Sequence, residues 1–499
     1  MDLFNNIIFG FGVALTPQNL LFCFFGALIG TLIGVLPGIG PLATLAMLLP
    51  ATFYLPPIPA LIMLAGIYYG AQYGGSTTAI LVNVPGESAS VVTCLDGHQM
   101  ARKGRAGAAL AIAALGSLFA GTVATFIIAI ASPPLSELAL KFLAPEYFSL
   151  MVLGLVGSMV LARGSLLNAV AMVFLGLLLG LVGTDVNSGR ERFTFDLPVL
   201  SDGIGFVPVA MGLFGVAEIL INLEKRDNRY IGTVIGSLMP TREEFRQAAP
   251  AILRGTVLGS LLGILPGGGA LLASFAAYAF EKKIAADPSR FGQGAIEGVA
   301  SPESANNAGA QTSFIPLLTL GIPSNPVMAL MIGAMMIQGI APGPQVMTQQ
   351  PDLFWGIIAS MWVGNLMLVI INLPLVGIWV TFLKIPYRLL FPSILLLCAI
   401  GSYSLNSSAT EVGLMALFGL LGYLFYKLDC EPAPLILGFI LGPMMEENLR
   451  RALIVSQGDP LVFVNRPISL TLLIMAALLM LLVVLPAFRK TRAEAFTEA

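Results

Sequence analysis

The chain has 499 residues, of which 57% are hydrophobic and only 10% are charged, and its mean hydropathy is +0.89. Soluble domains carry about 25% charged residues, so this composition excludes a soluble globular protein and indicates a polytopic membrane protein. The net charge of −2, without a dense basic cluster, argues against a nucleic-acid partner.

Apolar runs long enough to cross roughly 30 Å of hydrocarbon predict about a dozen membrane spans. They lie near 18–36, 57–74, 107–131, 146–162, 165–183, 203–222, 250–266, 326–341, 353–382, 388–404, 410–427, 432–444 and 467–487. Because an open sheet in lipid leaves backbone groups unpaired, we expect an all-α fold. The first Lys or Arg is Arg102, so no signal peptide is expected and the first apolar run is expected to remain as a span.

A twelve-residue motif occurs twice in the apolar sequence, and seven of its positions are identical. The copies are Gly30-Thr-Leu-Ile-Gly34-Val-Leu-Pro37-Gly38-Ile-Gly40-Pro41 and Gly259-Ser-Leu-Leu-Gly263-Ile-Leu-Pro266-Gly267-Gly-Gly269-Ala270. Interrupted helices at matching places of two halves are typical of transporter binding sites. The structural alternative is that the small residues only let helices pack closely.

A second element follows each motif. The first copy joins small hydroxyl residues at Ser76 and Thr77 to Pro85-Gly86, and the second joins Thr312-Ser313 to Pro323-Ser324. We expect each copy to form a re-entrant hairpin or an interrupted helix, because backbone freed by Pro and Gly must be buried in protein or line a cavity. Helix N-termini suit a carboxylate ligand, and free carbonyl and hydroxyl oxygens suit Na⁺. The predicted substrate-binding residues are Gly38, Gly40, Ser76, Thr77, Pro85, Gly86, Ser88, Gly267, Gly269, Thr312, Ser313, Pro323, Ser324 and Asn325.

Ionisable and amide side chains near these elements are candidates for cation coupling, since charges at membrane depth are costly and usually functional. They are Asn83, Glu87, Asp96, Glu303, Asn306 and Asn307. For Asp96, which precedes a basic segment, helix capping or a salt bridge is an equal alternative. The position of His98, the lone histidine, beside this segment favours a structural role over a proton relay. Cys23, Cys94, Cys398 and Cys430 lie far apart, so neither a disulfide framework nor a transition-metal site is expected.

The distribution of positive charge predicts that the two halves have opposite topology. Segment 51–60 has no charge, whereas its counterpart 281–290 contains Lys282, Lys283 and Arg290. The bias then reverses, because segment 98–105 is basic and its counterpart in the second half is not. The positive-inside rule therefore indicates inverted repeats. We expect a first transmembrane repeat at 1–223, a cytoplasmic linker at 224–249, a second repeat at 250–488 and a cytoplasmic tail at 489–499.

Three long motifs carry a family resemblance: Gly34–Gly40, then Gly74–Gly86 with Asp96–Gly104, then Pro302–Ala308 with Leu318–Pro323. They resemble the large membrane subunit of the tripartite tricarboxylate transporters, the TctA family, over nearly the whole chain. The resemblance implies a carrier of the bacterial inner membrane, driven by a Na⁺ or H⁺ gradient. It implies that a periplasmic TctC-like binding protein delivers a tricarboxylate or dicarboxylate, and that a small TctB-like membrane subunit takes part. Ser324-Asn325 replaces the Gly-Ser more often found in the family, so citrate is not assumed.

Other classes of function remain to be weighed. The chain has no phosphate-binding loop for ATP, so secondary transport by alternating access, without a cofactor beyond the coupling ion, is the simplest interpretation. A stand-alone carrier of an organic anion, without a binding protein, is the main alternative. A channel usually builds its pore by oligomerisation rather than from two inverted half-sites. An intramembrane hydrolase needs a nucleophile with a base, or a metal pair, and neither pattern occurs, so we expect no enzymatic activity.

Overall fold

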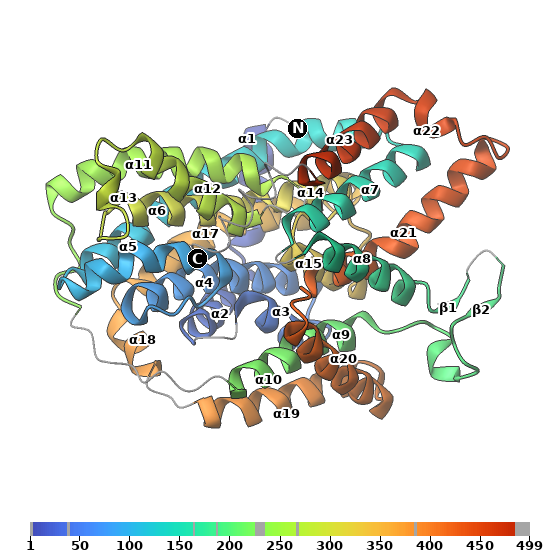
Figure 1. The fold of residues 1–499 in the computed structure, drawn as a ribbon, viewed down its shortest axis with the longest axis horizontal. Coiled ribbons are helices and arrows are strands. Elements are labelled where there is room, and N and C mark those ends of the chain that lie inside the picture. Colours follow the sequence, from blue (N-terminus) through green and yellow to red (C-terminus); the bar gives the residue numbers. More distant parts are fainter. Residues whose placement is uncertain are drawn as a thin grey trace.

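The computed structural model describes residues 3–36, 40–162, 165–185, 188–224, 235–265, 269–383 and 387–484. Secondary structure in these ranges is almost entirely helical, and helices from both halves of the chain lie together in one body (Figure 1). The sheet found there is one antiparallel hairpin, in which β1 (Gly183–Thr184) pairs with β2 (Glu191–Arg192). The predicted all-α class is confirmed. The linker residues 225–234 and the predicted tail at 489–499 lie outside the described residues.

The first half of the chain runs from α1 to α10. Its helices are α1 (Leu3–Ala14), α2 (Pro17–Val35), α3 (Gly40–Thr52), α4 (Pro57–Val82), η1 (Ser88–Ser90), α5 (Val91–Arg102), α6 (Ala106–Ala139), α7 (Ala144–Leu161), α8 (Leu166–Gly180), η2 (Pro198–Leu200), α9 (Phe206–Ala210), the π-helical turn η3 (Met211–Val216) and α10 (Ala217–Glu224). The stretch near 74–82, which we expected to form part of a re-entrant hairpin or an interrupted helix, is instead the last part of the continuous helix α4.

The second half runs from α11 to α23. Its helices are α11 (Arg242–Gly263), α12 (Gly269–Ile284), η4 (Pro288–Arg290), α13 (Glu297–Thr312), α14 (Phe314–Leu320), α15 (Pro326–Ile337), α16 (Gln345–Gln349), α17 (Pro351–Asn372), α18 (Val376–Phe382), α19 (Tyr387–Asn406), α20 (Ala409–Lys427), α21 (Ala433–Val455), α22 (Val462–Asn465) and α23 (Pro467–Val484). Helix α11 begins inside the segment predicted as a linker, because Thr241 and Glu244 form a capping box there.

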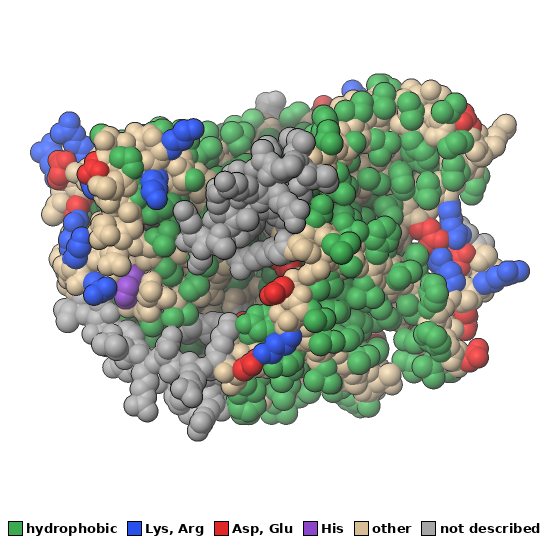
Figure 2. Space-filling model, viewed as in Figure 1, with side chains coloured by type: hydrophobic (Ala, Val, Ile, Leu, Met, Phe, Trp, Pro, Cys, Tyr) green, Lys and Arg blue, Asp and Glu red, His purple; other side chains and the backbone are tan. Residues whose placement is uncertain are grey.

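Five of the described helical segments are long and apolar enough to cross a bilayer. They are Pro17–Val35, Ala106–Ala139, Phe206–Glu224, Pro351–Asn372 and Ala409–Lys427, and apolar helices of 10–17 residues accompany them. On the face seen in Figure 2, charged side chains gather at the two ends of the long axis, with a smaller group between them, and hydrophobic side chains cover much of the coloured surface between the ends. Such a surface belongs in lipid, so the chain is a multi-pass membrane protein. The number of spans stays a prediction.

Glycines hold two equivalent helix pairs in close contact. A methyl group on Gly30 or Gly34 of α2 would lie 2.4 Å from a carbonyl oxygen of α4. On α11, the same group on Gly259 or Gly263 would lie 2.3 or 2.4 Å from a carbonyl oxygen of α13. Backbones approach this closely only when the interface lacks side chains. The first two glycines of each motif therefore serve helix packing, which was the structural alternative.

We expect the substitution Gly259→Ala to lower thermal stability, because overpacking a tight interface costs about 1–3 kcal/mol. The midpoint temperature of unfolding, followed in detergent by size-exclusion chromatography after heating, measures the loss. Gly413→Ala on α20 is the matched control, since a methyl group there meets no atom within 4 Å. Equal midpoints for the two variants would contradict the packing role.

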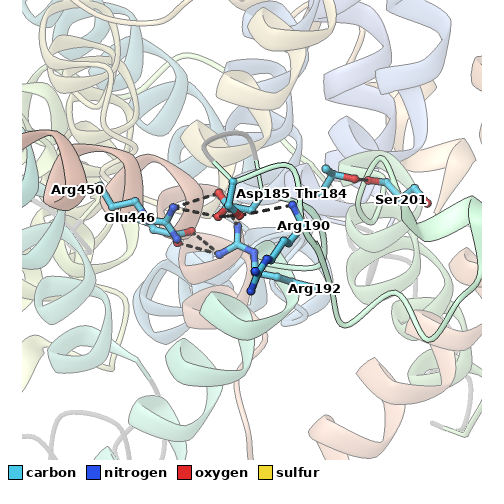
Figure 3. A network of polar contacts seen from close by, with 8 residues as sticks. Thr184, Asp185, Arg190, Arg192, Ser201, Glu446 and Arg450 are labelled. Atoms are coloured by element: carbon cyan, nitrogen blue, oxygen red, sulfur yellow. Dashed lines mark hydrogen bonds and ion pairs between the residues drawn. The ribbon is translucent and has the colours of Figure 1, made fainter.

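An ion-pair network joins the β1–β2 hairpin to α21 (Figure 3). Arg450 Nη1 lies 3.0 Å from Asp185 Oδ2, and Arg450 Nη2 lies 2.5 Å from Glu446 Oε1. Arg192 Nη1 contacts the same Glu446 oxygen at 2.8 Å. The hairpin lies at the end of the long axis opposite α5 and α11 (Figure 1). The arginines are partly exposed, so the network positions the hairpin and contributes little to stability.

Candidate functional site at the helix interruptions

Both copies of the repeated motif interrupt a helix. Helix α2 ends at Val35 and α3 begins at Gly40, whereas α11 ends at Gly263 and α12 begins at Gly269. Gly40 and Gly269 have φ angles of +56° and +50°, a conformation that L side chains rarely adopt. The glycines therefore let each new helix start where the previous one stops. Gly38 and Gly267 lie outside the described residues.

The element after each motif also forms the same turn twice. Helix α4 is followed by Asn83 with a φ of 59°, and α14 is followed by Gly321 with a φ of 71°. Four residues later in each copy, a side chain caps the next helix. Glu87 Oε2 accepts the Ala89 N–H at 2.9 Å, and Asn325 Oδ1 accepts the Met328 N–H at 3.0 Å. Pro85 lies between Asn83 and the capping residue Glu87, and Pro323 lies between Gly321 and the capping residue Asn325. Both prolines therefore occupy the same position in a repeated turn.

These turns lie beside the motif glycines of their own half. An added methyl group on Gly86 would lie 2.0 Å from the Gly34 carbonyl oxygen, and one on Gly269 would lie 3.1 Å from Asn325 Nδ2. Asn325 Nδ2 also donates to Ser313 Oγ at 3.0 Å, and the Ser324 hydroxyl donates to the Ser313 carbonyl. The structure thus brings each interruption and the following turn together, as a site with contributions from both requires.

Glu303 on α13 is 1% exposed, and among the candidate carboxylates only Asp96, at 0%, is more deeply buried. Ser76 Oγ of α4 donates to its Oε2 at 2.5 Å, and the Thr93 hydroxyl of α5 donates to its Oε1. No Lys, Arg or His pairs with Glu303 in the described part of the chain. A buried carboxylate of this kind needs a proton or a cation to balance its charge.

The neighbouring amides of α13 connect Glu303 to the turn of the first half. Asn306 Nδ2 donates to Glu87 Oε1 at 3.0 Å, and Asn307 Nδ2 donates to Ser117 Oγ of α6 at 2.7 Å. Glu87 is buried and likewise has no cationic partner within the described ranges. Four of the six predicted coupling candidates therefore lie in one polar cluster between the halves.

The other two coupling candidates have different surroundings. Asp96 accepts hydrogen bonds from the Gly294 and Ala295 N–H groups at 2.7 and 2.8 Å and from the Tyr278 hydroxyl at 2.9 Å. These donors fit the capping alternative, in which Asp96 anchors the segment before α13. Asn83 is exposed, and its left-handed backbone ends α4.

The remaining predicted site residues divide by burial. Thr77 and Thr312 are buried, and their hydroxyls donate to carbonyl oxygens of their own helices, at Tyr73 and Ala308. Ser88 is exposed at the start of η1. His98 Nδ1 lies 3.1 Å from the Ile80 carbonyl oxygen, which agrees with a structural role.

Sequence reasoning missed several polar residues beside the cluster. Thr93, Ser117, Tyr73 and Asn372 are all at least nine-tenths buried. Tyr73 and Thr93 lie close to predicted site residues, whereas Ser117 and Asn372 each lie nearly alone in an apolar run. Such isolated residues give a weak signal, because many buried hydroxyls only bond to their own helix.

Comparison with known proteins identifies the relatives of this chain. The tripartite tricarboxylate transporter TctA family matches residues 20–437. The chain belongs to this family. As a family member it is a component of a tripartite tricarboxylate transporter, and the family is one of transporters rather than enzymes. Its membership confirms the resemblance seen in the motifs.

Two relatives of this TctA-family protein are named without an activity. The chain is 60% identical over 499 residues, 100% of its own length and 99% of the relative's, to an "uncharacterized 52.8 kDa protein in TAR-I ttuC' 3'region" of Agrobacterium vitis. It is 60% identical over 240 residues, 48% of its length, to an "uncharacterized protein in TAR-II ttuC' 3'region" of the same organism, and this match covers 99% of that relative. No solved structure matches the chain significantly.

Proposed function

We propose that this TctA-family protein is the large membrane subunit of a secondary importer that takes up a tricarboxylate or dicarboxylate by alternating access. In this proposal a Na⁺ or H⁺ gradient drives uptake, a periplasmic binding protein delivers the substrate and a small membrane subunit completes the complex in the bacterial inner membrane. The observation that carries the proposal is the buried cluster of Glu87, Glu303 and Asn306, which joins the two halves without a cationic partner among the described residues.

The interruptions support a carboxylate as the substrate. Helices α3 and α12 both begin at the last glycine of the motif, and their first N–H groups have no partners within the helix. Such N-termini carry partial positive charge and favour an anion. The neighbouring Asn325 amide supplies a further donor, because its Nδ2 has a second hydrogen besides the one that it donates to Ser313 Oγ. A carboxylate at these N-termini and a cation at the acidic cluster would offset each other's charge.

Two contacts between loops support inverted repeats. Lys103 Nζ, after α5, donates to the Gln293 carbonyl, after α12, at 2.5 Å. Gln338 Nε2, after α15, donates to the Thr52 carbonyl, at the end of α3, at 2.7 Å. Helices α3 and α12 are equivalent, as are α5 and α15. Repeats of the same orientation would place the ends of α3 and α12 on the same side of the membrane. Inversion allows the halves to exchange conformations during alternating access.

Uptake into proteoliposomes tests the proposal. Purified chain, reconstituted with the small membrane subunit, is supplied with candidate binding proteins and a panel of labelled dicarboxylates and tricarboxylates. We expect accumulation that requires the binding protein and a Na⁺ or pH gradient. Accumulation without any binding protein would favour a stand-alone carrier, and uptake that only equilibrates the substrate would contradict coupling.

The substitution Ser76→Ala is expected to weaken coupling, because it removes the hydroxyl that donates to Glu303. Loss of one hydrogen bond to a charged group corresponds to about a tenfold rise in the cation concentration for half-maximal uptake. Ser289→Ala, in the exposed turn η4, is the control, since its hydroxyl bonds only to Asp287. If Ser76→Ala kept the cation dependence of the unmodified protein, the acidic cluster would not be the binding site of the coupling cation.

A further inference from the structure

A small cavity lies between helices α4, α6 and α17, next to the acidic cluster. Its volume is about 20 Å³, and polar side chains of Tyr73, Ser76, Thr77, Ser117 and Asn372 line part of it. The rest of the lining is apolar, from Leu110, Ala113, Ala114, Leu373 and Val376. A cavity of this volume holds one water-sized particle. Neither Tyr73 nor Asn372 was among the residues predicted for the site.

Two oxygens on residues that line the cavity have no hydrogen-bond partner among the described residues. They are Tyr73 Oη and Asn372 Oδ1, on side chains that are 3% and 6% exposed. The orientation of the Asn372 amide is fixed, because its Nδ2 donates to the Leu368 carbonyl at 2.8 Å and to Thr31 Oγ1 at 3.2 Å. Leaving a buried polar group unpaired costs about 1–3 kcal/mol, so two of them in one cavity indicate a ligand.

The charge around the cavity favours a cation over a neutral ligand. None of the ten lining residues is Lys, Arg or His. Ser76 lines the cavity and also contacts Glu303, the buried carboxylate without a cationic partner in the described chain. Ser117, another lining residue, accepts from Asn307 and so keeps an oxygen lone pair for a further contact. The lining therefore presents neutral oxygens beside a negative charge, which is the environment that Na⁺ requires.

We propose that a single Na⁺ ion binds in this cavity, with Tyr73 Oη and Asn372 Oδ1 as ligands and with its charge balanced by Glu303. The site rests on the proposed function, because it assigns the coupling ion of the transporter and its location. The lining hydroxyls of Ser76, Thr77 and Ser117 complete the oxygen shell. Since Ser76 contacts both the cavity and Glu303, binding of the ion and the state of the acidic cluster are linked.

The test uses Tyr73→Phe, which removes one proposed ligand without breaking any hydrogen bond that the hydroxyl makes in the described structure. Tyr69→Phe is the matched control, because Tyr69 lies one turn earlier on α4 and contacts α17 near Gly364, outside the cavity lining. The first readout is the thermal stability of the purified chain, titrated with NaCl against choline chloride at constant ionic strength. A ligand that binds the folded state raises the unfolding temperature.

We expect NaCl to stabilise the unmodified protein and Tyr69→Phe alike, and Tyr73→Phe to need about tenfold more Na⁺ for the same effect, as loss of one ligand implies. The Na⁺ concentration for half-maximal uptake should shift by the same factor. Equal titrations for the two variants, or no stabilisation by Na⁺, would mean that the cavity holds only water. Uptake driven by a pH gradient alone would overturn the site and leave the proposed importer standing. Stabilisation by Na⁺ without any carboxylate uptake would support the site and overturn the proposed importer.

Discussion

Replacement of Glu303 by Gln is expected to reduce cation-driven accumulation of the substrate by about a hundredfold while leaving the fold intact. The carboxylate is 1% exposed and touches only neutral donors, Ser76 and Thr93. A glutamine fills the same volume and still accepts from one hydroxyl, but it removes the negative charge that attracts the cation. A hundredfold change corresponds to about 2.7 kcal/mol, which is modest for the loss of a charged partner in a buried site.

Exchange transport separates coupling from folding in this variant. Exchange of internal labelled substrate for external unlabelled substrate needs no net movement of the cation, so Glu303→Gln should retain exchange and lose accumulation. Thermal stability should stay unchanged or increase, because an uncompensated buried charge disappears. Accumulation at the level of the unmodified protein would show that Glu303 does not take part in coupling.

Glu281→Gln is the control for Glu303→Gln. Glu281 is also buried, at 2% exposed, but its two oxygens accept from Arg254 at 2.7 and 2.8 Å. Its charge is already balanced within the protein, so this variant should lose thermal stability and keep its coupling. The opposite responses of two buried glutamates would separate a cation-binding carboxylate from a structural one.

The interruptions and turns were accessible from the sequence because Pro and Gly act locally. Pro37-Gly38 and Pro266-Gly267 mark the ends of two apolar runs, and helices end before them and restart after them. The repeated turn also follows from local chemistry, since Asn and Gly tolerate the left-handed conformation at positions 83 and 321. The length of α4 was not accessible. Gly74 lies inside that helix and serves its packing, since a methyl group there would lie 2.3 Å from the Thr31 carbonyl oxygen of α2.

The partners of the acidic residues could not be predicted, because helix packing decides them. Glu303 meets Ser76 and Thr93 across more than two hundred residues of sequence. The cavity requires α4, α6 and α17 to pack together, and its lining residue Asn372 looks like an ordinary polar interruption of an apolar run. The sequence left two interpretations of the motif glycines open, a binding site or close helix packing. The short distances from an added methyl group to the neighbouring carbonyl oxygens assign Gly30 and Gly259 to packing.

The substitution Gly269→Ala is expected to raise the KM for the transported carboxylate by about tenfold, a second large effect. Gly269 starts α12 with a φ of +50°, and an L residue in this region costs about 1–2 kcal/mol. The new methyl group would lie 3.1 Å from Asn325 Nδ2 and would displace the side chain that caps α15. Both effects move donor groups at the proposed carboxylate site, so substrate affinity should fall more than stability.

Two further glycines make the cause of that effect measurable. Gly40→Ala introduces the same backbone strain at the equivalent helix start, with a φ of +56°, but its methyl group comes no closer than 4.0 Å to the Gly86 carbonyl. Gly104→Ala adds strain at a φ of +77° in the loop after α5, where nothing lies within 4 Å. We expect KM to rise most for Gly269→Ala, less for Gly40→Ala and not at all for Gly104→Ala, although all three lose stability. Gly104→Ala introduces the same kind of backbone strain outside the proposed carboxylate site. A KM increase in that variant would therefore assign the effect to general destabilisation and not to the carboxylate site.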